Sequence, residues 1–105
     1  MVHQISSDDF EELIKDKKVF LLDVREKSEF DAGHIKGAKL VSSIRFDEGF
    51  EKLNIKKKDK IALYCLNGNR SDFIGKKLAD QGFDKIYNLE MGIVEWLDYG
   101  KSLTK

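Results

Sequence analysis

Two short runs of consecutive apolar residues place the strongest limit on how this chain can fold. Residues 19–22 read Val-Phe-Leu-Leu, and residues 61–64 read Ile-Ala-Leu-Tyr. A strand that is apolar at every position is typical of a parallel sheet with both faces covered. Elsewhere, apolar residues recur at the three- and four-residue spacing of amphipathic helices. The alternation predicts an α/β fold, a small parallel β-sheet flanked by helices on both faces.

The same reading gives the remaining elements. We expect three further strands, over residues 2–5, 38–41 and 86–89. We expect helices after Ser6 or Ser7, across Phe46 to Leu53, over residues 71–81 and around Ile93 to Leu97. Ser71 is expected to cap the third of these helices, and Gly82 to follow its end.

Length and composition exclude several classes of protein. A chain of 105 residues has the length of one domain, residues 1–105. Its longest apolar runs are four or five residues, whereas a membrane span needs about 20. Its 19 basic residues balance 19 acidic ones, which gives no electrostatic footprint for nucleic acid. One cysteine permits no internal disulfide and no cysteine-cluster metal site. We therefore expect a cytoplasmic protein with no metal, cofactor, membrane or nucleic-acid partner.

The segment Cys65-Leu66-Asn67-Gly68-Asn69-Arg70-Ser71 carries the clearest chemical signal. It follows a buried strand and precedes a helix, at the strand ends where parallel sheets bind ligands. A loop of this kind can turn its backbone N–H groups inward around the cysteine sulfur, and the helix N-terminus adds partial positive charge. Arg70 adds a full positive charge. All three effects favour the thiolate, so Cys65 is expected to be a nucleophile.

This loop resembles the active-site loop of rhodanese-like sulfurtransferase domains. Residues 21–41, LLDVREKSEFDAGHIKGAKLV, are similar to the D-V-R-E…E-F…G-H-I-x-G-A signature of that family. Residues 71–96 are similar to its last helix, strand and closing G-x-x-x-W. Met91 stands where the family often has a second glycine, and is expected to narrow the rim of the pocket.

The resemblance implies a thiosulfate sulfurtransferase of the rhodanese type. Cys65 would take a sulfane sulfur from thiosulfate or polysulfide, hold it as a persulfide and pass it to cyanide or a thiol. Arg70 would be the second catalytic residue. The substrate would be bound by the loop, at Leu66, Asn67, Gly68, Asn69 and Ser71. The first alternative is a persulfide carrier that delivers sulfur to a protein acceptor.

The second alternative is a phosphatase or arsenate reductase of the same fold. Such phosphatases use C-x-x-x-x-x-R, but here only four residues separate Cys65 from Arg70. One residue corresponds to about 3.3–3.6 Å of chain. The shorter loop is expected to exclude a phosphate and to accommodate an added sulfur, which lies only about 2.05 Å from its partner.

Two charged residues after the first buried run complete the candidate site. Asp23 is expected to be structural, as an acceptor for neighbouring loop N–H groups or for Arg70. Arg25 is expected either to steer an anionic donor or to form a surface ion pair with Glu26 or Glu29.

Overall fold

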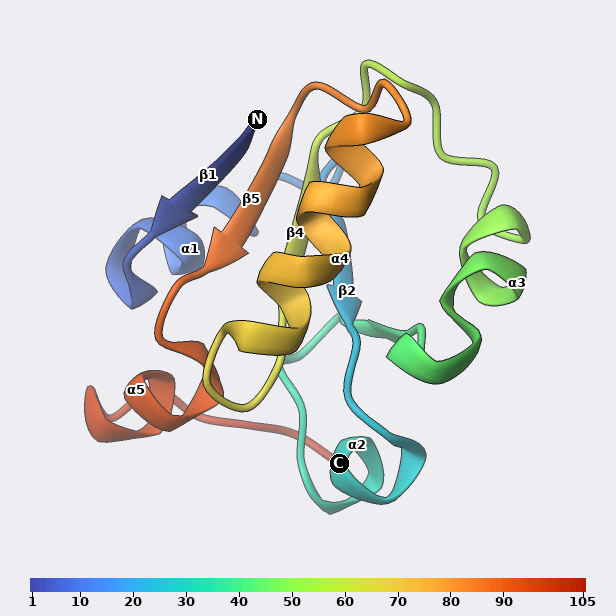
Figure 1. Ribbon diagram of the computed structural model, residues 1–105. Helices are drawn as coiled ribbons and strands as arrows, with labels where there is room; N and C mark the ends of the chain where they lie inside the picture. The colour runs from blue at the N-terminus through green and yellow to red at the C-terminus, as the bar shows by residue number, and fades with distance from the viewer.

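A computed structural model of residues 1–105 contains one five-stranded sheet in the order β1-β5-β4-β2-β3 (Figure 1). All four strand pairs are parallel, as predicted. The strands are β1 (Val2–Ile5), β2 (Phe20–Asp23), β3 (Lys39–Leu40), β4 (Ile61–Tyr64) and β5 (Ile86–Leu89). The helices are α1 (Ser7–Leu13), α2 (Lys27–Ala32), the 3₁₀ turn η1 (Ser43–Arg45), α3 (Phe46–Glu51), α4 (Asn69–Asp80) and α5 (Gly92–Asp98).

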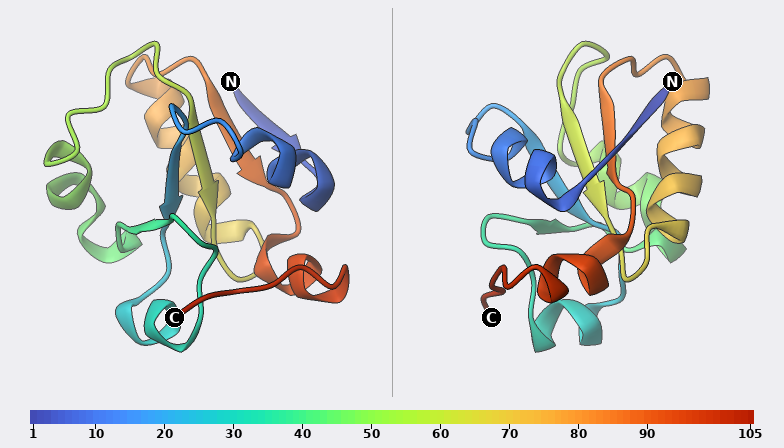
Figure 2. Two further views of the ribbon diagram at one scale, coloured as in Figure 1. Left: turned by 180° about the vertical axis from the view of Figure 1, so that it is seen from behind. Right: turned by 90° about the vertical axis from the view of Figure 1, so that its left-hand side faces the viewer.

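Helices cover both faces of the sheet, which explains the uninterrupted apolar runs (Figure 2). In β4, Ile61 and Leu63 pack in one cluster with side chains of α3 and α4. Ala62 and Tyr64 point the other way, into a second cluster with α1 and α5. Because successive side chains of a strand alternate between faces, all four residues are buried. The predicted architecture is therefore confirmed.

The parallel arrangement brings the carboxyl ends of β2, β4 and β5 to one edge of the sheet. Asp23 ends β2, Cys65 follows β4, and Glu90 follows β5. Helix α2 and the end of the chain lie beyond this edge (Figure 1). There, His34 and Thr104 exchange two backbone hydrogen bonds in an antiparallel bridge that the sequence did not predict.

Two predicted boundaries are wrong. Helix α4 begins at Asn69 rather than after a Ser71 cap, because Gly68, with φ of +93°, is the N-cap three residues earlier. Ser71 is consequently buried within the first turn. Strand β3 has only two residues, because the Ala38 N–H closes a turn onto Ile35 instead of pairing with β2. No helix is both long enough and apolar enough to cross a bilayer.

Candidate active site around Cys65

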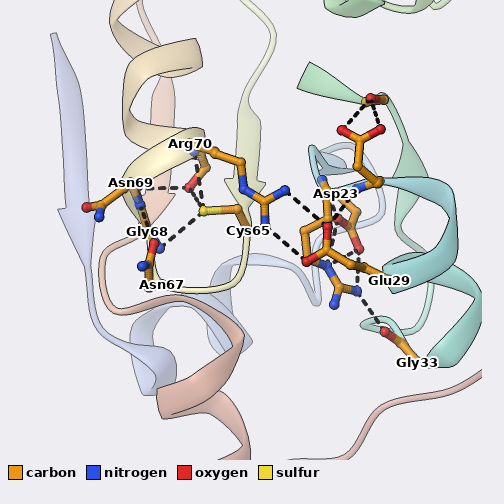
Figure 3. A network of polar contacts seen from close by, with 12 residues as sticks. Asp23, Glu29, Gly33, Cys65, Asn67, Gly68, Asn69 and Arg70 are labelled. Carbon is orange, nitrogen blue, oxygen red and sulfur yellow. Dashed lines mark hydrogen bonds and ion pairs between the residues drawn. The ribbon is translucent and has the colours of Figure 1, made fainter. Parts of the chain in front are cut away.

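The loop after β4 surrounds the Cys65 sulfur with hydrogen-bond donors (Figure 3). The Gly68 N–H donates to Sγ at 3.2 Å and the Ser71 N–H at 3.4 Å. The Ser71 hydroxyl also lies 3.4 Å from Sγ. Cys65 itself is 0% exposed. The sulfur is therefore buried, but in a polar setting that can stabilise negative charge, as in an oxyanion hole.

The other loop residues hold the backbone rather than the sulfur. The Asn69 N–H donates to the Asn67 side-chain oxygen at 3.1 Å, which fixes the turn. The carbonyls of Cys65 and Leu66 accept hydrogen bonds from the N–H groups of Ile93 and Val94 in α5. Of the five predicted substrate-binding loop residues, the structure thus brings Gly68 and Ser71 to the sulfur.

Two glycines allow the loop to touch the turn between β5 and α5. A Cβ on Gly68 would lie 1.9 Å from the Glu90 carbonyl oxygen. A Cβ on Gly92, which has φ of +68°, would lie 2.3 Å from the Leu66 carbonyl oxygen. Real Cβ atoms cannot approach so closely, so the two backbones can pack together only where both residues are glycine.

Arg70 forms a bidentate ion pair with Glu29 at the start of α2 (Figure 3). Both N–O distances are 3.1 Å, and both side chains are partly exposed. Hydrogen bonding from Arg70 lowers the pKa of Glu29 below its ordinary value. Glu29 is held in turn by a capping box, in which its carboxylate accepts from the Glu26 N–H. The predicted contact of Arg70 with Asp23 is absent.

The expected surface ion pair of Arg25 with Glu26 or Glu29 is wrong, while the steering of an anionic donor by Arg25 stays a prediction. Its side chain is only 5% exposed and bonds to both carboxylate oxygens of Asp23, at 2.8–3.1 Å. It also donates to the Gly33 carbonyl at 2.7 Å. A buried guanidinium needs such partners, because an isolated buried charge is strongly destabilising. Asp23 additionally accepts the Arg25 N–H at 2.9 Å. The pair connects the end of β2 to the loop after α2.

Sequence reasoning missed Asn88, which lies on β5 behind the loop. Its side chain is 1% exposed and contacts both Ser71 and the Gly68 carbonyl. The signal was present in the segment Ile86-Tyr87-Asn88-Leu89, where an amide interrupts a strand predicted to be buried. A buried amide requires hydrogen-bond partners, so polar groups had to be expected next to Asn88.

A half-open groove lies beside the loop. It has a volume of about 430 Å³ and is lined by Ser43, Ile44, Asn69, Arg70, Phe73 and Ile74. Ile44 and Phe73 are 77% and 73% exposed. Leu66 and Met91 are further exposed apolar residues at or next to the loop. The rim of the loop therefore carries exposed apolar side chains beside the Arg70–Glu29 pair.

A buried parallel strand, a loop of inward N–H groups and a helix N-terminus thus meet at one cysteine. The comparisons give the family. A model described as the rhodanese-like domain matches residues 6–99, and the chain belongs to this family. It is 31% identical over 96 residues to thiosulfate sulfurtransferase GlpE of Coxiella burnetii, which covers 91% of this chain and 88% of that protein.

Two further matches are to a longer protein and to a homodimer. The chain is 34% identical over 94 residues to tRNA uridine(34) hydroxylase of Hamiltonella defensa, covering 86% of this chain but only 26% of the hydroxylase. It therefore spans about a quarter of that relative. Among solved structures, the polysulfide-sulfur transferase homodimer of Wolinella succinogenes matches with a TM-score of 0.85 at 26% identity, covering 98% of this chain and 78% of that one. The family and the likenesses to GlpE and to the polysulfide-sulfur transferase support sulfurtransfer as the class of chemistry.

Replacement of Gly68 by alanine tests the close packing of the loop. We expect Gly68→Ala to slow alkylation of Cys65 by iodoacetamide several-fold, because the new methyl group displaces the loop from Glu90. The clash with Glu90 should also destabilise the fold by about 1–3 kcal/mol. The positive φ of residue 68 adds a backbone strain of about 1–2 kcal/mol once the residue is not glycine. The matched control is Gly37→Ala. Gly37 has a similar φ of +89°, so the same backbone strain arises there, but a new Cβ would meet no atom within 4 Å. Equal urea stability and equal alkylation in the two variants would contradict the packing argument.

The Arg70–Glu29 pair should stabilise the fold only when Glu29 is ionised. Because the folded-state pKa of Glu29 lies below its ordinary value, the contribution is present above the ordinary glutamate range. It is lost as the pH falls through the lowered pKa. We expect Glu29→Gln to cost less than about 1 kcal/mol near neutral pH, and this difference from wild type to shrink in acid. Urea unfolding across pH measures it, with Glu51→Gln, at an exposed glutamate without an ion pair, as control. A difference that grows in acid would contradict this assignment.

Proposed function

We propose that this protein is a sulfurtransferase in which Cys65 carries a sulfane sulfur as a persulfide. The observation that carries the proposal is the convergence of two backbone N–H groups and one hydroxyl on Sγ. The Cys65 loop also precedes α4, a helix of 12 residues. The N-terminus of that helix adds partial positive charge. The proposed donor is thiosulfate or a polysulfide, and the proposed acceptor is cyanide or a thiol.

In the first step, the Cys65 thiolate attacks the outer sulfur of thiosulfate. A new S–S bond forms to Sγ, and the S–S bond of the donor breaks. Its electron pair leaves with sulfite, so the negative charge of the thiolate reappears on the outer sulfur of Cys65–S–S⁻. Because Cys65 has no exposed surface, the donor reaches Sγ only after the loop or rim side chains move.

In the second step, the acceptor attacks the outer sulfur of the persulfide. Cyanide leaves as thiocyanate and the electron pair of the S–S bond returns to Sγ, which regenerates the thiolate. The same donors serve both steps, because they stabilise the charge on Sγ before loading and after release. No side chain needs to remove a proton when Cys65 is already ionised.

The charge near the loop favours sulfur over phosphate chemistry. Arg70 is the only cation in the loop, and its guanidinium is already paired with Glu29. The two inward N–H groups bond to Sγ itself, so they are not free to bind the oxygens of a phosphate. A phosphate dianion would need several free donors above the sulfur. We therefore propose sulfur transfer rather than phosphatase or arsenate reductase activity.

One observation favours the persulfide carrier as a second candidate. Exposed Ile44 and Phe73 line the groove that Arg70 and Asn69 border, and exposed Leu66 is part of the loop. An apolar rim suits a protein acceptor more than a small anion, since protein interfaces have apolar centres.

Mass spectrometry of the intact protein tests the persulfide directly. After incubation with thiosulfate, we expect a mass increase of one sulfur atom, which cyanide then removes with release of thiocyanate. Cys65→Ala should show neither event while remaining folded in the urea-free buffer of the assay. A protein that stays unmodified by thiosulfate, but gains sulfur from a protein persulfide, supports the carrier. Hydrolysis of an aryl phosphate that disappears in Cys65→Ser would instead support a phosphatase.

Removal of Arg70 tests the contribution of its charge. We expect Arg70→Ala to slow both alkylation of Cys65 at pH 6 and sulfur loading by about tenfold, because a cation near the sulfur favours the thiolate. The matched control is Arg45→Ala, at an exposed arginine outside the loop. Alkylation of Arg70→Ala at the wild-type rate would show that the backbone N–H groups suffice without it.

A further inference from the structure

A chain of side-chain amides connects the edge strand β1 to the Ser71 hydroxyl. The Gln4 amide nitrogen donates to Asp72 at 2.6 Å, and its oxygen accepts from the Asn88 nitrogen at 2.7 Å. The Asn88 nitrogen also donates to the Gly68 carbonyl at 3.2 Å, and its oxygen accepts from Ser71 Oγ. This network joins β1, β5 and the start of α4, and it ends beside the cysteine sulfur.

The orientation of the Asn88 amide follows from its partners. The Gly68 carbonyl can only accept hydrogen bonds, so it must face the NH₂ group of Asn88. Gln4 points its own NH₂ group at the Asp72 carboxylate, and therefore presents its oxygen to Asn88. Both hydrogens of the Asn88 amide are thus engaged, and its oxygen must face Ser71.

The Ser71 hydroxyl has one proton and three acceptors within reach, namely the Asn88 oxygen, Cys65 Sγ at 3.4 Å and the Gly68 carbonyl at 3.3 Å. Because the Gly68 carbonyl already accepts from the Asp72 N–H and from Asn88, the main competition is between the Asn88 oxygen and the sulfur. A charged acceptor attracts the proton more strongly than a neutral one. When Sγ is a thiolate, the hydroxyl can turn to the sulfur. When Sγ lies within a persulfide, the charge moves to the outer sulfur, and the hydroxyl returns to Asn88.

We propose that Asn88 is a positioning residue for sulfur transfer, an inference that rests on the proposed function. Its amide oxygen competes with Cys65 for the Ser71 proton. It thereby stabilises the persulfide state relative to the thiolate, because it supplies the buried hydroxyl with a partner when Sγ is neutral. Asn88 acts through Ser71 and does not itself touch the sulfur.

Removal of the amide should make the cysteine more reactive. In Asn88→Ala the Ser71 proton loses the Asn88 acceptor and is shared between the sulfur and the Gly68 carbonyl. We therefore expect alkylation by iodoacetamide at pH 6 to be about threefold faster than in wild type, from the loss of one competing hydrogen bond. At high pH, where every thiol is ionised, the rates should agree. A merely structural role would change the rate at high pH as well, since a loosened loop alters the access of iodoacetamide to the sulfur whatever its charge.

Two further variants keep the test decisive. Asn88→Leu retains most of the side-chain volume without an acceptor, and it replaces Asn88→Ala if that variant fails to fold. The matched control is Gln4→Ala, which removes another hydrogen bond of the same network and leaves the Asn88 oxygen on Ser71. We expect it to alkylate at the wild-type rate. Slower alkylation of both Asn88 variants, or faster alkylation of Gln4→Ala, would overturn the proposal.

A Ser71→Ala background shows whether the effect passes through the hydroxyl. There we expect Asn88→Ala to leave the alkylation rate unchanged, since no proton remains to be shared. A threefold gain that persists in Ser71→Ala would overturn the proposal. Alkylation reports the thiolate whichever substrate is used, so this result is separate from the loading of sulfur by thiosulfate. If thiosulfate does not load sulfur onto the protein, but Asn88→Ala is still alkylated faster than wild type, thiosulfate is refuted as the donor and the role of Asn88 stands.

Discussion

The hydrogen bonds from the Gly68 and Ser71 backbone to the Cys65 sulfur depend on the shape of a very short loop. The chain must leave β4, reverse, and enter α4 within a few residues while its N–H groups stay turned inward. Gly68 permits the reversal through its positive φ, and Gly92 lets the neighbouring turn approach. Backbone donors of this kind cost no reorganisation when charge arrives, because the fold already holds them in place.

Charge is placed around the sulfur in two separate layers. Nearest to Sγ are neutral donors, which no change of pH can remove. Farther out, Arg70 is partly neutralised by Glu29, while Arg25 and Asp23 are paired within the interior. The two arginines therefore hold the surrounding loops in place as much as they contribute an electric field at the sulfur. This arrangement suits the proposed cycle, in which negative charge moves from Sγ to the outer sulfur of the persulfide and back.

The sequence predicted those features that depend on local pattern. The continuous runs at β2 and β4 gave the parallel sheet, and the position of Cys65 between a strand and a helix gave the loop. Contacts between distant segments were harder to predict. Arg25 reads as a surface residue until Gly33 and the end of β2 are known to enclose it. Arg70 and Glu29 are 41 positions apart, and nothing in either segment specifies their pairing. Asn88 could have been found, because an amide inside a buried strand requires partners.

The bridge between His34 and Thr104 determines where the chain ends in space. It holds the last residues against the loop after α2, and Leu103 packs over Gly33. The C-terminus therefore lies beyond the same edge of the sheet that carries the cysteine loop (Figure 1). Any tag or domain fused after Lys105 would begin on this side of the molecule. The length and stiffness of the tether would then decide whether the fused part shields the thiol or can exchange sulfur with it.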